Sequence, residues 1–304
     1  MPLFKAKKLN ISKTLSDKYI VPPFSVFNTH QSYFRERMRM WRDIGVVGNA
    51  GRNKNLAYDN RRMEKGKIDP NGTSTFNPVV CEIIYKWFAR KGDIIFDPFA
   101  GGITRGGVAI FCDCGYIGYD INTKQVSVNA QQYEELADKY EVDANAIYLC
   151  VDSEKATIPE HNLFFTCPPY YNLERYTDNP NDLSNCTSYK MFLLKYKSIL
   201  KRSLECLYED SFAVIVVSDV RDKKTGEYYP LVADTTEIMI DLGLKYYNEI
   251  ILYNDTGNLA ITSGNYLDRA RKVGRQHQNI LVFYKGNTKN IKEKFGEVNI
   301  NAST

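Results

Sequence analysis

Short apolar runs alternate with longer amphipathic stretches along most of the chain. A short apolar run that ends at a polar or turn-forming residue is typical of a buried strand, and an apolar stripe with a period near 3.6 is typical of a helix. The expected strands are 93–96, 116–119, 147–150, 163–165, 212–217, 246–253 and 279–284, and the expected helices are 32–44, 78–90, 105–112, 124–139, 189–208 and 235–242. This alternation predicts an α/β fold with a doubly wound, mostly parallel sheet whose final strands can pair antiparallel.

The length of 304 residues suits one large α/β domain with insertions. We expect a basic N-terminal segment at 1–75, a main domain at 76–286 with an irregular insertion at 254–278, and a tail at 287–304. Seven cysteines, an odd number, favour reduced thiols over a disulfide framework, and the scattered histidines predict no metal site. No apolar run approaches membrane-spanning length, and Met1 to Lys5 has no apolar signal region.

Positive charge is concentrated near the N-terminus. Residues 35–67 carry ten basic and four acidic side chains, a net charge of +6, while the remaining chain carries −2. A basic segment with aromatic neighbours suits a phosphate backbone, with Arg35 and Arg39 as candidate contacts. The alternative is a solvated face of a helix whose apolar side consists of Tyr33, Met38, Met40, Trp41 and Ile44. Basic residues also mark the insertion as a second nucleic-acid-facing segment, with Arg269, Arg271 and Lys272 as candidates.

Three successive expected strands end at an acid: Asp97, Asp120 and Asp152. Open α/β sheets bind ligands at the carboxyl ends of their strands, so these side chains should gather at one edge. Asp120 resembles the acid of dinucleotide-binding folds that accepts hydrogen bonds from ribose hydroxyls. Gly101 and Gly102 follow the first strand and allow the backbone to turn closely past a ligand.

The fourth strand runs directly into Cys167, Pro168, Pro169 and Tyr170. Two prolines stop a strand and fix their own φ angles, which leaves backbone carbonyls and the Tyr170 ring projecting from the sheet edge. This loop lies about seventy residues after the loop that begins at Asp97. We expect the two loops to meet at a single site.

Together the two loops resemble the S-adenosylmethionine-dependent amino-methyltransferases of DNA, with a Rossmann-like fold. The resemblance implies that Asp97 accepts from the methionine ammonium or from the loop's own amides, and that Asp152 accepts from the adenine amino group. It implies further cofactor contacts by Asn77, Pro78, Pro98, Phe99, Gly101 and Gly102. Pro168 and the side chain at position 167 would orient the exocyclic amine of a base, while Tyr170 stacks on the flipped base and Tyr171 assists.

Two positions depart from the family pattern. Cys167 stands where the family has Asp, Asn or Ser, and a neutral thiol is a weak acceptor. A thiolate would accept strongly, and attack of the cysteine on a pyrimidine ring is a third alternative. Gly101 to Arg105 replaces the usual Gly-Ser-Gly-Thr, which leaves the role of Arg105 open.

The segment after Tyr171, with Pro22 to Val26 and His277 to Asn279, resembles phage-type DNA methylases with a Cys-Pro-Pro-Tyr loop. This implies candidate base-pocket residues in Glu174, Asp219 and Arg221, whose alternative role is capping or ion pairing. It implies double-stranded DNA as partner, no membrane, and the cytoplasm of a bacterium or phage-infected cell. The expected product is N6-methyladenine; N4-methylcytosine, an RNA substrate and a non-catalytic nucleic-acid-binding role remain open, as do a cognate restriction enzyme and the oligomeric state.

Overall fold

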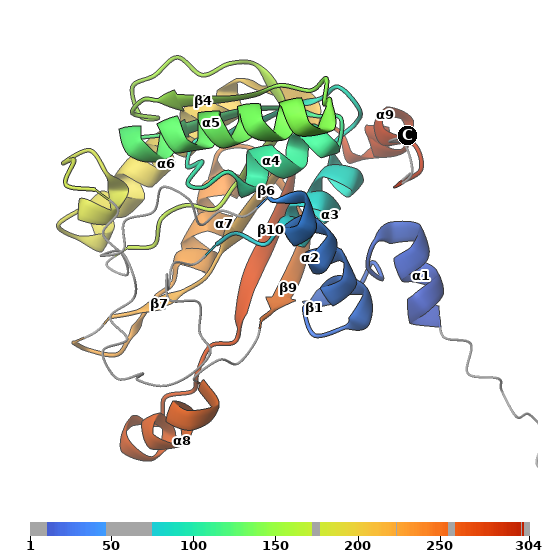
Figure 1. Cartoon of the computed structure of the whole chain (residues 1–304). Coiled ribbons are helices and arrows are strands. Elements are labelled where there is room, and N and C mark those ends of the chain that lie inside the picture. The colour runs from blue at the N-terminus through green and yellow to red at the C-terminus, as the bar shows by residue number, and fades with distance from the viewer. Residues whose placement is uncertain are drawn as a thin grey trace, which may run out of the picture.

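The computed structural model describes residues 11–46, 75–171, 177–222, 224–254, 259–298 and 300. Its α-helices are α1 (Ile11–Tyr19), α2 (Ser32–Ile44), α3 (Pro78–Phe88), α4 (Thr104–Phe111), α5 (Thr123–Tyr140), α6 (Tyr189–Glu205), α7 (Leu231–Asp241), α8 (Leu259–Ala270) and α9 (Ile291–Phe295). Its strands are β1 (Val26–Asn28), β2 (Ile94–Asp97), β3 (Gly115–Asp120), β4 (Ala146–Cys150), β5 (His161–Thr166), β6 (Leu207–Val217), β7 (Val220–Arg221), β8 (Tyr228–Tyr229), β9 (Lys245–Tyr253) and β10 (His277–Lys285). Figure 1 shows their arrangement.

Eight strands form one sheet in the order β1-β9-β10-β6-β5-β2-β3-β4. Strands β2 to β6 pair parallel with their neighbours, whereas β10 pairs antiparallel with both β6 and β9. The doubly wound, mostly parallel sheet predicted from the sequence is confirmed. The order of the strands switches between β2 and β5, which pair parallel, so the loops that follow these two strands begin side by side at the carboxyl edge.

Helices cover both faces of the sheet. Buried side chains of α2, α3, α4 and α5 form one core with the strands, and those of α6 and α7 form the other. Helix α3 begins where Asn77 Oδ1 accepts hydrogen bonds from the amides of Val79 and Val80, with Pro78 at the first helical position. These contacts fix the start of α3 beside the carboxyl edge.

The described part of the N-terminal segment belongs to the main body of the molecule. Strand β1 pairs parallel with β9, and α2 buries Phe34 and Trp41 in the core. Residues 15–46 of the basic N-terminal segment thus pack with the strands and helices of the main domain. The expected apolar face of α2 needs correction, because Phe34 is buried whereas Met40 is 39% exposed.

Two segments expected to be irregular contain helices. The insertion at 254–278 holds α8, which Figure 1 shows set apart from the sheet, beyond the ends of β9 and β10. The tail holds α9, whose Phe295 ring packs against Phe212 at 4.9 Å between centroids. Helix α8 gave no clear sequence signal because its apolar residues, among them Ile261 and Tyr266, are exposed and bury no stripe.

All seven cysteines are free. Among the residues that the structure describes, no helix combines the length and the apolar character needed to cross a membrane.

Candidate active site

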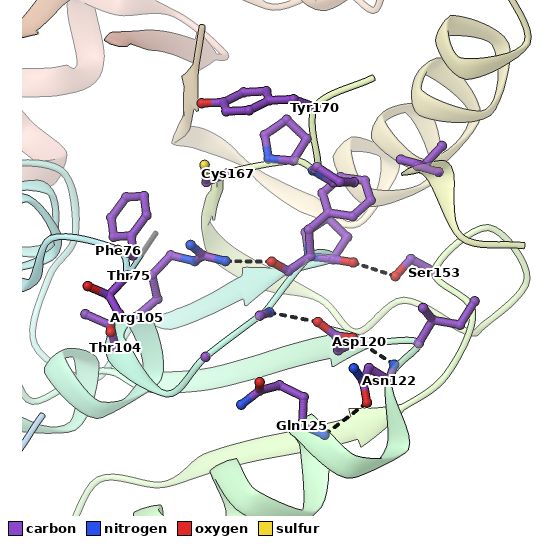
Figure 2. Close-up of a pocket in the computed structure, with 18 of the residues that line it drawn as sticks. Thr75, Phe76, Thr104, Arg105, Asp120, Asn122, Gln125, Ser153, Cys167 and Tyr170 are labelled. Carbon is purple, nitrogen blue, oxygen red and sulfur yellow. Dashed lines mark hydrogen bonds between the residues drawn. The ribbon is translucent and has the colours of Figure 1, made fainter. Parts of the chain in front are cut away.

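A cavity of about 520 Å³ opens at the carboxyl edge of the sheet, in the size range of small-molecule sites (Figure 2). It brings together segments far apart in sequence: the start of α3, the loop after β2, the ends of β3 and β4, and the loop after β5. The candidate residues that line it are Asn77, Pro78, Pro98, Phe99, Gly101, Gly102, Asp120, Asp152, Cys167, Pro168, Pro169 and Tyr170. The structure thus joins both predicted loops in one site.

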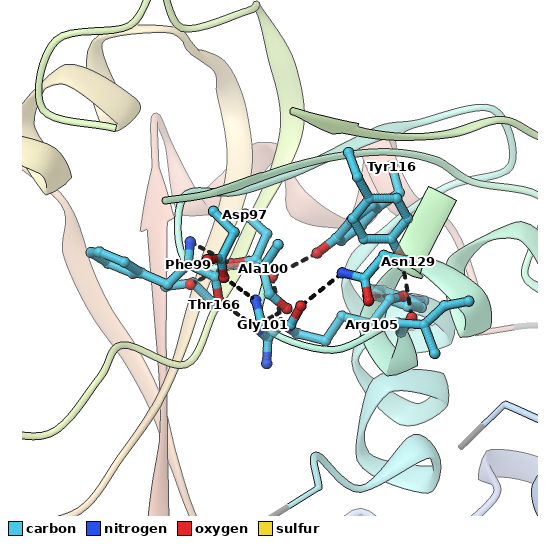
Figure 3. Close-up of polar contacts among 12 residues, drawn as sticks. Asp97, Phe99, Ala100, Gly101, Arg105, Tyr116, Asn129 and Thr166 are labelled. Carbon is cyan, nitrogen blue, oxygen red and sulfur yellow. Dashed lines mark hydrogen bonds and ion pairs between the residues drawn. The ribbon is translucent and has the colours of Figure 1, made fainter. Parts of the chain in front are cut away.

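Asp97 lies beneath this cavity rather than in its wall. The side chain is fully buried, and its carboxylate accepts hydrogen bonds from Tyr116 Oη at 2.8 Å and Thr166 Oγ1 at 2.5 Å (Figure 3). It also accepts from the Phe99 amide at 3.1 Å and pairs with Arg105 Nε at 2.5 Å. Of the two roles considered for Asp97, contact with a loop amide is observed, whereas a direct contact with a methionine ammonium is not supported by this position.

Arg105 supports the loop after β2 from within the fold. Besides its pair with Asp97, its Nη2 donates to the carbonyls of Phe99 at 2.6 Å and Ala100 at 3.0 Å. Burial acts to lower the pKa of Arg105, but the Asp97 carboxylate together with Tyr116 and Cys167 outweighs this, and the pKa is raised. The guanidinium therefore stays charged and holds the glycine loop through its carbonyl oxygens.

The glycine loop is also held from the β3 and α5 side. Gly101 has a positive φ of 54°, its amide donates to Asp120 Oδ2 at 2.9 Å, and its carbonyl accepts from Asn129 Nδ2 at 2.7 Å. Gln125 Nε2 in turn donates to Asn129 Oδ1 at 2.9 Å. The loop is thus fixed before any ligand binds, and its glycine backbone faces the cavity.

Asp120 lines the cavity at the end of β3. Its Oδ2 accepts from Gly101 and its Oδ1 accepts from the Asn122 amide at 2.8 Å. Burial raises the pKa of Asp120 to about 6, although these two amide bonds act to lower it. Each carboxylate oxygen has a second lone pair, so the group can still accept from a diol in the cavity.

Asp152 lines the cavity beyond the end of β4. Its Oδ1 accepts from the Glu154 amide at 3.0 Å. Its Oδ2 is buried and lies 3.5 Å from Lys155 Nζ, but no described residue donates a hydrogen bond to it. A buried acceptor in the wall of a cavity is suited to a ligand that carries a donor.

The loop after β5 forms the opposite wall (Figure 2). Cys167 is partly buried and packs against the core, while Tyr170 lies near the mouth, where its hydroxyl accepts from Gln278 Nε2 at 2.8 Å. Tyr171 points elsewhere: it packs edge-on against Tyr229 with 4.9 Å between ring centroids, and it does not line the cavity. The candidate role of Tyr171 as a substrate contact is therefore corrected to anchoring the loop.

The other base-pocket candidates lie outside the cavity wall. Asp219 pairs with Arg275 at 3.0 Å and accepts from the Val232 amide, and Arg221 covers the Tyr228 ring within the β7–β8 hairpin. Their alternative roles, capping and ion pairing, are the ones observed. Glu174 lies outside the described residues.

The basic candidates lie on α2 and in the insertion. Arg35 and Arg39 are exposed on α2, and Arg269 and Arg271 are exposed at the end of α8, whereas Lys272 is partly buried beside the β7–β8 turn. Arg37, by contrast, is paired with the buried carboxylate of Glu82. The basic side chains of α2 thus include one in a structural ion pair, Arg37, and others that are exposed, Arg35 and Arg39. The remaining basic residues of 35–67, from Arg52 onward, lie outside the described residues.

Several lining residues were not among the sequence candidates. They are Met38, Arg42, Thr75, Phe76, Thr104, Arg105, Asn122, Gln125, Ser153, Asn181, Asp182, Asn254 and Gln278. Ser153 directly follows Asp152 and Asn122 lies two residues after Asp120, positions that could have identified them. Gln278 and Asn254 come from the two antiparallel strands, and only the pairing of β9 with β10 brings them to the site.

Neither a protein-family model nor a curated protein sequence matches the chain. Among solved structures, the 4+2 cyclase SpnF aligns over 83% of this chain and 96% of its own, with 12% identity and a TM-score of 0.49. TrmN from Thermus thermophilus aligns over 69% of this chain but 49% of its own, with 14% identity and a TM-score of 0.44, so the chain spans about half its length. The magnesium protoporphyrin IX methyltransferase ChlM from Synechocystis PCC 6803, with bound SAM, aligns over 64% and 71%, with 11% identity and a TM-score of 0.40. At these identities the likeness concerns the fold alone.

Proposed function

We propose that this chain is an S-adenosylmethionine-dependent methyltransferase that modifies the exocyclic amine of a flipped DNA base, preferably N6 of adenine. The observation that carries this proposal is the common cavity. Its wall contains the glycine loop, Asp120 and Asp152 on one side and the Cys167 to Tyr170 loop on the other. A nucleoside cofactor and a planar base would thus meet at one sheet edge.

The cavity wall fits the cofactor. Asp120 offers two carboxylate oxygens to ribose hydroxyls, and the unsatisfied Asp152 Oδ2 offers an acceptor to the adenine amino group. Asn77 and Pro78 at the start of α3, with the glycine loop, would hold the methionine end. Asp97 contributes indirectly, by fixing that loop. When bound, the cofactor supplies an electrophilic methyl group on sulfur.

The loop after β5 supplies orientation rather than covalent chemistry. The Pro168 carbonyl and the Cys167 side chain would accept hydrogen bonds from the target amine, which localises the lone pair on nitrogen and directs it at the methyl group. The nitrogen gains the methyl group as the carbon–sulfur bond breaks, and the nitrogen then loses a proton. Tyr170 would stack on the extruded base at the mouth of the cavity.

Exposed basic side chains support a duplex as the substrate. Arg35 and Arg39 on α2, Arg269 on α8 and Arg271 just after it are exposed at the surface, where they could reach phosphates, with Lys272 next in sequence. Arg42 on the same face of α2 reaches the cavity wall. N4 of cytosine is the second candidate target, because the same loop would orient either exocyclic amine.

Transfer of a labelled methyl group tests the proposal. The chain is incubated with tritiated S-adenosylmethionine and unmethylated duplex DNA, or with RNA of matched sequence, and the nucleosides are separated by mass spectrometry. N6-methyladenine or N4-methylcytosine in the DNA sample is the expected result. Label in RNA alone would replace DNA by RNA as substrate, and tight cofactor binding without transfer would favour a nucleic-acid-binding role.

A further inference from the structure

The Tyr170 ring needs a support that its own loop does not provide. Pro168 and Pro169 fix the backbone φ angles ahead of it, but they leave the side-chain torsions of Tyr170 unset. Tyr171 anchors the chain on the far side through its aromatic contacts. The Tyr170 ring packs partly against the core around α6, and the contact of its hydroxyl adds a second restraint on the orientation of the ring.

That contact comes from β10, on the opposite side of the cavity mouth. Gln278 Nε2 donates to Tyr170 Oη at 2.8 Å, and Gln278 Oε1 lies 3.5 Å from Asn254 Nδ2. Gln278 pairs with Leu252 in the β9–β10 ladder, and the Asn254 amide donates to the Gln276 carbonyl at 2.9 Å. The side-chain amide of Gln278 thus contacts Tyr170 at one end and Asn254 at the other, and its backbone is fixed by the β9–β10 ladder.

The three side chains share one position in the fold. Tyr170, Gln278 and Asn254 all line the mouth of the cavity, and Gln278 and Asn254 stand at the two strand ends between which the α8 insertion leaves and re-enters the sheet. A side-chain amide that lies in a cavity wall and bonds to the hydroxyl of an aromatic ring restricts the rotation of that ring. Ordering the ring before a base arrives reduces the entropy lost on stacking.

We propose that Gln278 is a positioning residue that holds the Tyr170 ring in the orientation that receives the target base. The inference rests on the proposed function, since it assumes a planar base at Tyr170. Gln278 does not contact the reacting amine in this scheme; it acts through the phenol hydroxyl. Asn254 supports Gln278 from behind.

A double-mutant cycle tests this assignment. Gln278→Met keeps the side-chain volume and removes the donor, and Tyr170→Phe keeps the ring and removes the acceptor. Each single variant should lose about tenfold in kcat/KM on unmethylated duplex DNA, and the double variant should lose no more than either one. The Kd for S-adenosylmethionine, measured by calorimetry, should stay within about twofold of wild type in all three.

Gln276→Met is the matched control, because Gln276 lies two residues before Gln278, just ahead of β10, and does not line the cavity. It should retain wild-type kcat/KM. Independent, multiplicative losses in the two single variants would overturn the assignment, as would wild-type kinetics for Gln278→Met. A lowered Tm and a weakened cofactor Kd in proportion to the lost activity would show a purely structural role. If the wild-type chain transfers no methyl group to DNA, the proposed function fails. If the wild type is active and Gln278→Met is equally active, only the assignment of Gln278 fails.

Discussion

Thr166 Oγ1 donates a hydrogen bond to Asp97 Oδ1 at 2.5 Å, in the fully buried layer beneath the two loops of the site. Thr166 is the last residue of β5 and directly precedes Cys167, whereas Asp97 is the last residue of β2 and begins the glycine loop. One hydrogen bond thus ties the end of the proposed base-binding strand to the end of the proposed cofactor-binding strand. The relative position of the two loops depends on it.

Thr166→Val removes this hydrogen bond at nearly constant volume. The free energy of unfolding should fall by about 1–3 kcal/mol, because a buried carboxylate loses a donor, and the Kd for S-adenosylmethionine should rise. Chemical denaturation and calorimetry measure the two effects. Thr236→Val is the control: Thr236 Oγ1 donates to the Val232 carbonyl within α7 at 2.9 Å and neither residue lines the cavity, so cofactor affinity should not change. Unchanged cofactor affinity in a destabilised Thr166→Val would refute the coupling.

Arg105→Lys keeps the charge but loses the forked geometry that bonds Asp97 and two carbonyls at once. We expect cofactor affinity to fall by at least about tenfold, because the glycine loop loses its support. Arg90→Lys is the matched control, since Arg90 pairs with Asp93 near the protein surface away from the cavity. A folded Arg105→Lys with wild-type Kd would show that the loop keeps its shape without the guanidinium.

Cofactor affinity should depend on pH through Asp120. Its pKa of about 6 lies above the ordinary value, so the apo protein holds a proton on Asp120 below that pH and the acceptor for ribose is lost. Binding that favours the ionised form should therefore weaken by up to about tenfold for each pH unit below 6. Calorimetric Kd values between pH 5 and 8 test this. Asp120→Asn should abolish the dependence, and a wild-type Kd that is constant across this range would contradict the ribose role.

The same raised pKa has the opposite effect on the stability of the apo protein. Between the unfolded pKa of 3.8 and the folded pKa of about 6, the folded state binds more protons, so the contribution of Asp120 to stability is present at low pH and is lost as pH rises through 6. His161, buried with its pKa lowered to about 4, contributes in the other direction and loses its stabilising effect as pH falls. Comparing wild type with Asp120→Asn isolates the Asp120 contribution.

Cys167→Ser distinguishes an orienting side chain from a nucleophile. A serine hydroxyl accepts a hydrogen bond at least as well as a neutral thiol, so transfer to an exocyclic amine should persist within about tenfold. Denaturing electrophoresis of wild-type protein with duplex containing 5-fluorocytosine should show no covalent adduct. Complete loss of activity in Cys167→Ser together with an adduct in wild type would favour attack on a pyrimidine ring.

Gly106→Ala tests how tightly α4 packs under the cavity. A Cβ at Gly106 would overlap the Tyr148 hydroxyl and come within 2.7 Å of the Tyr116 ring, and both rings are buried. The free energy of unfolding should fall by about 1–3 kcal/mol. Gly264→Ala on α8 is the matched helical control: no described atom lies within 4 Å of its Cβ, and it should stabilise by up to about 1 kcal/mol. Equal stability of the two variants would exclude this packing.

The sequence allowed the strand ends to be placed because each buried run stops at a polar side chain. Asp97, Asp120 and Asp152 end or follow runs of apolar residues, and parallel pairing brings such ends to one edge whatever the loop details. The prediction that the Cys167 loop meets the glycine loop followed from the same rule. The length of an apolar run and the polar residue that ends it can both be read locally from the sequence. In a parallel sheet, these two features are enough to place the end of each strand at the carboxyl edge.

The direction of single side chains could not be predicted in the same way. Asp97 and Asp120 look alike in sequence, yet Asp97 turns inward because Arg105 and Tyr116 offer it buried donors. Tyr170 and Tyr171 are adjacent, but Tyr171 packs among the Tyr189, Phe192 and Tyr229 rings and so does not line the cavity. Such choices depend on partners many residues away, and α8 was missed because its apolar side chains are not buried against any strand or helix that would give them a period.

The hydrogen bond from the Asn254 amide to the Gln276 carbonyl closes the β9–β10 ladder before the chain departs into α8. Asn254 and Gln276 therefore lie opposite each other at two adjacent strand ends, a gap that a hairpin loop of two to five residues can also bridge. A different helix or loop grafted at this junction should leave Gln278, Tyr170 and the cavity in place if it keeps Arg275, which bonds Asp219 and Asn279 on either side of the β10 start.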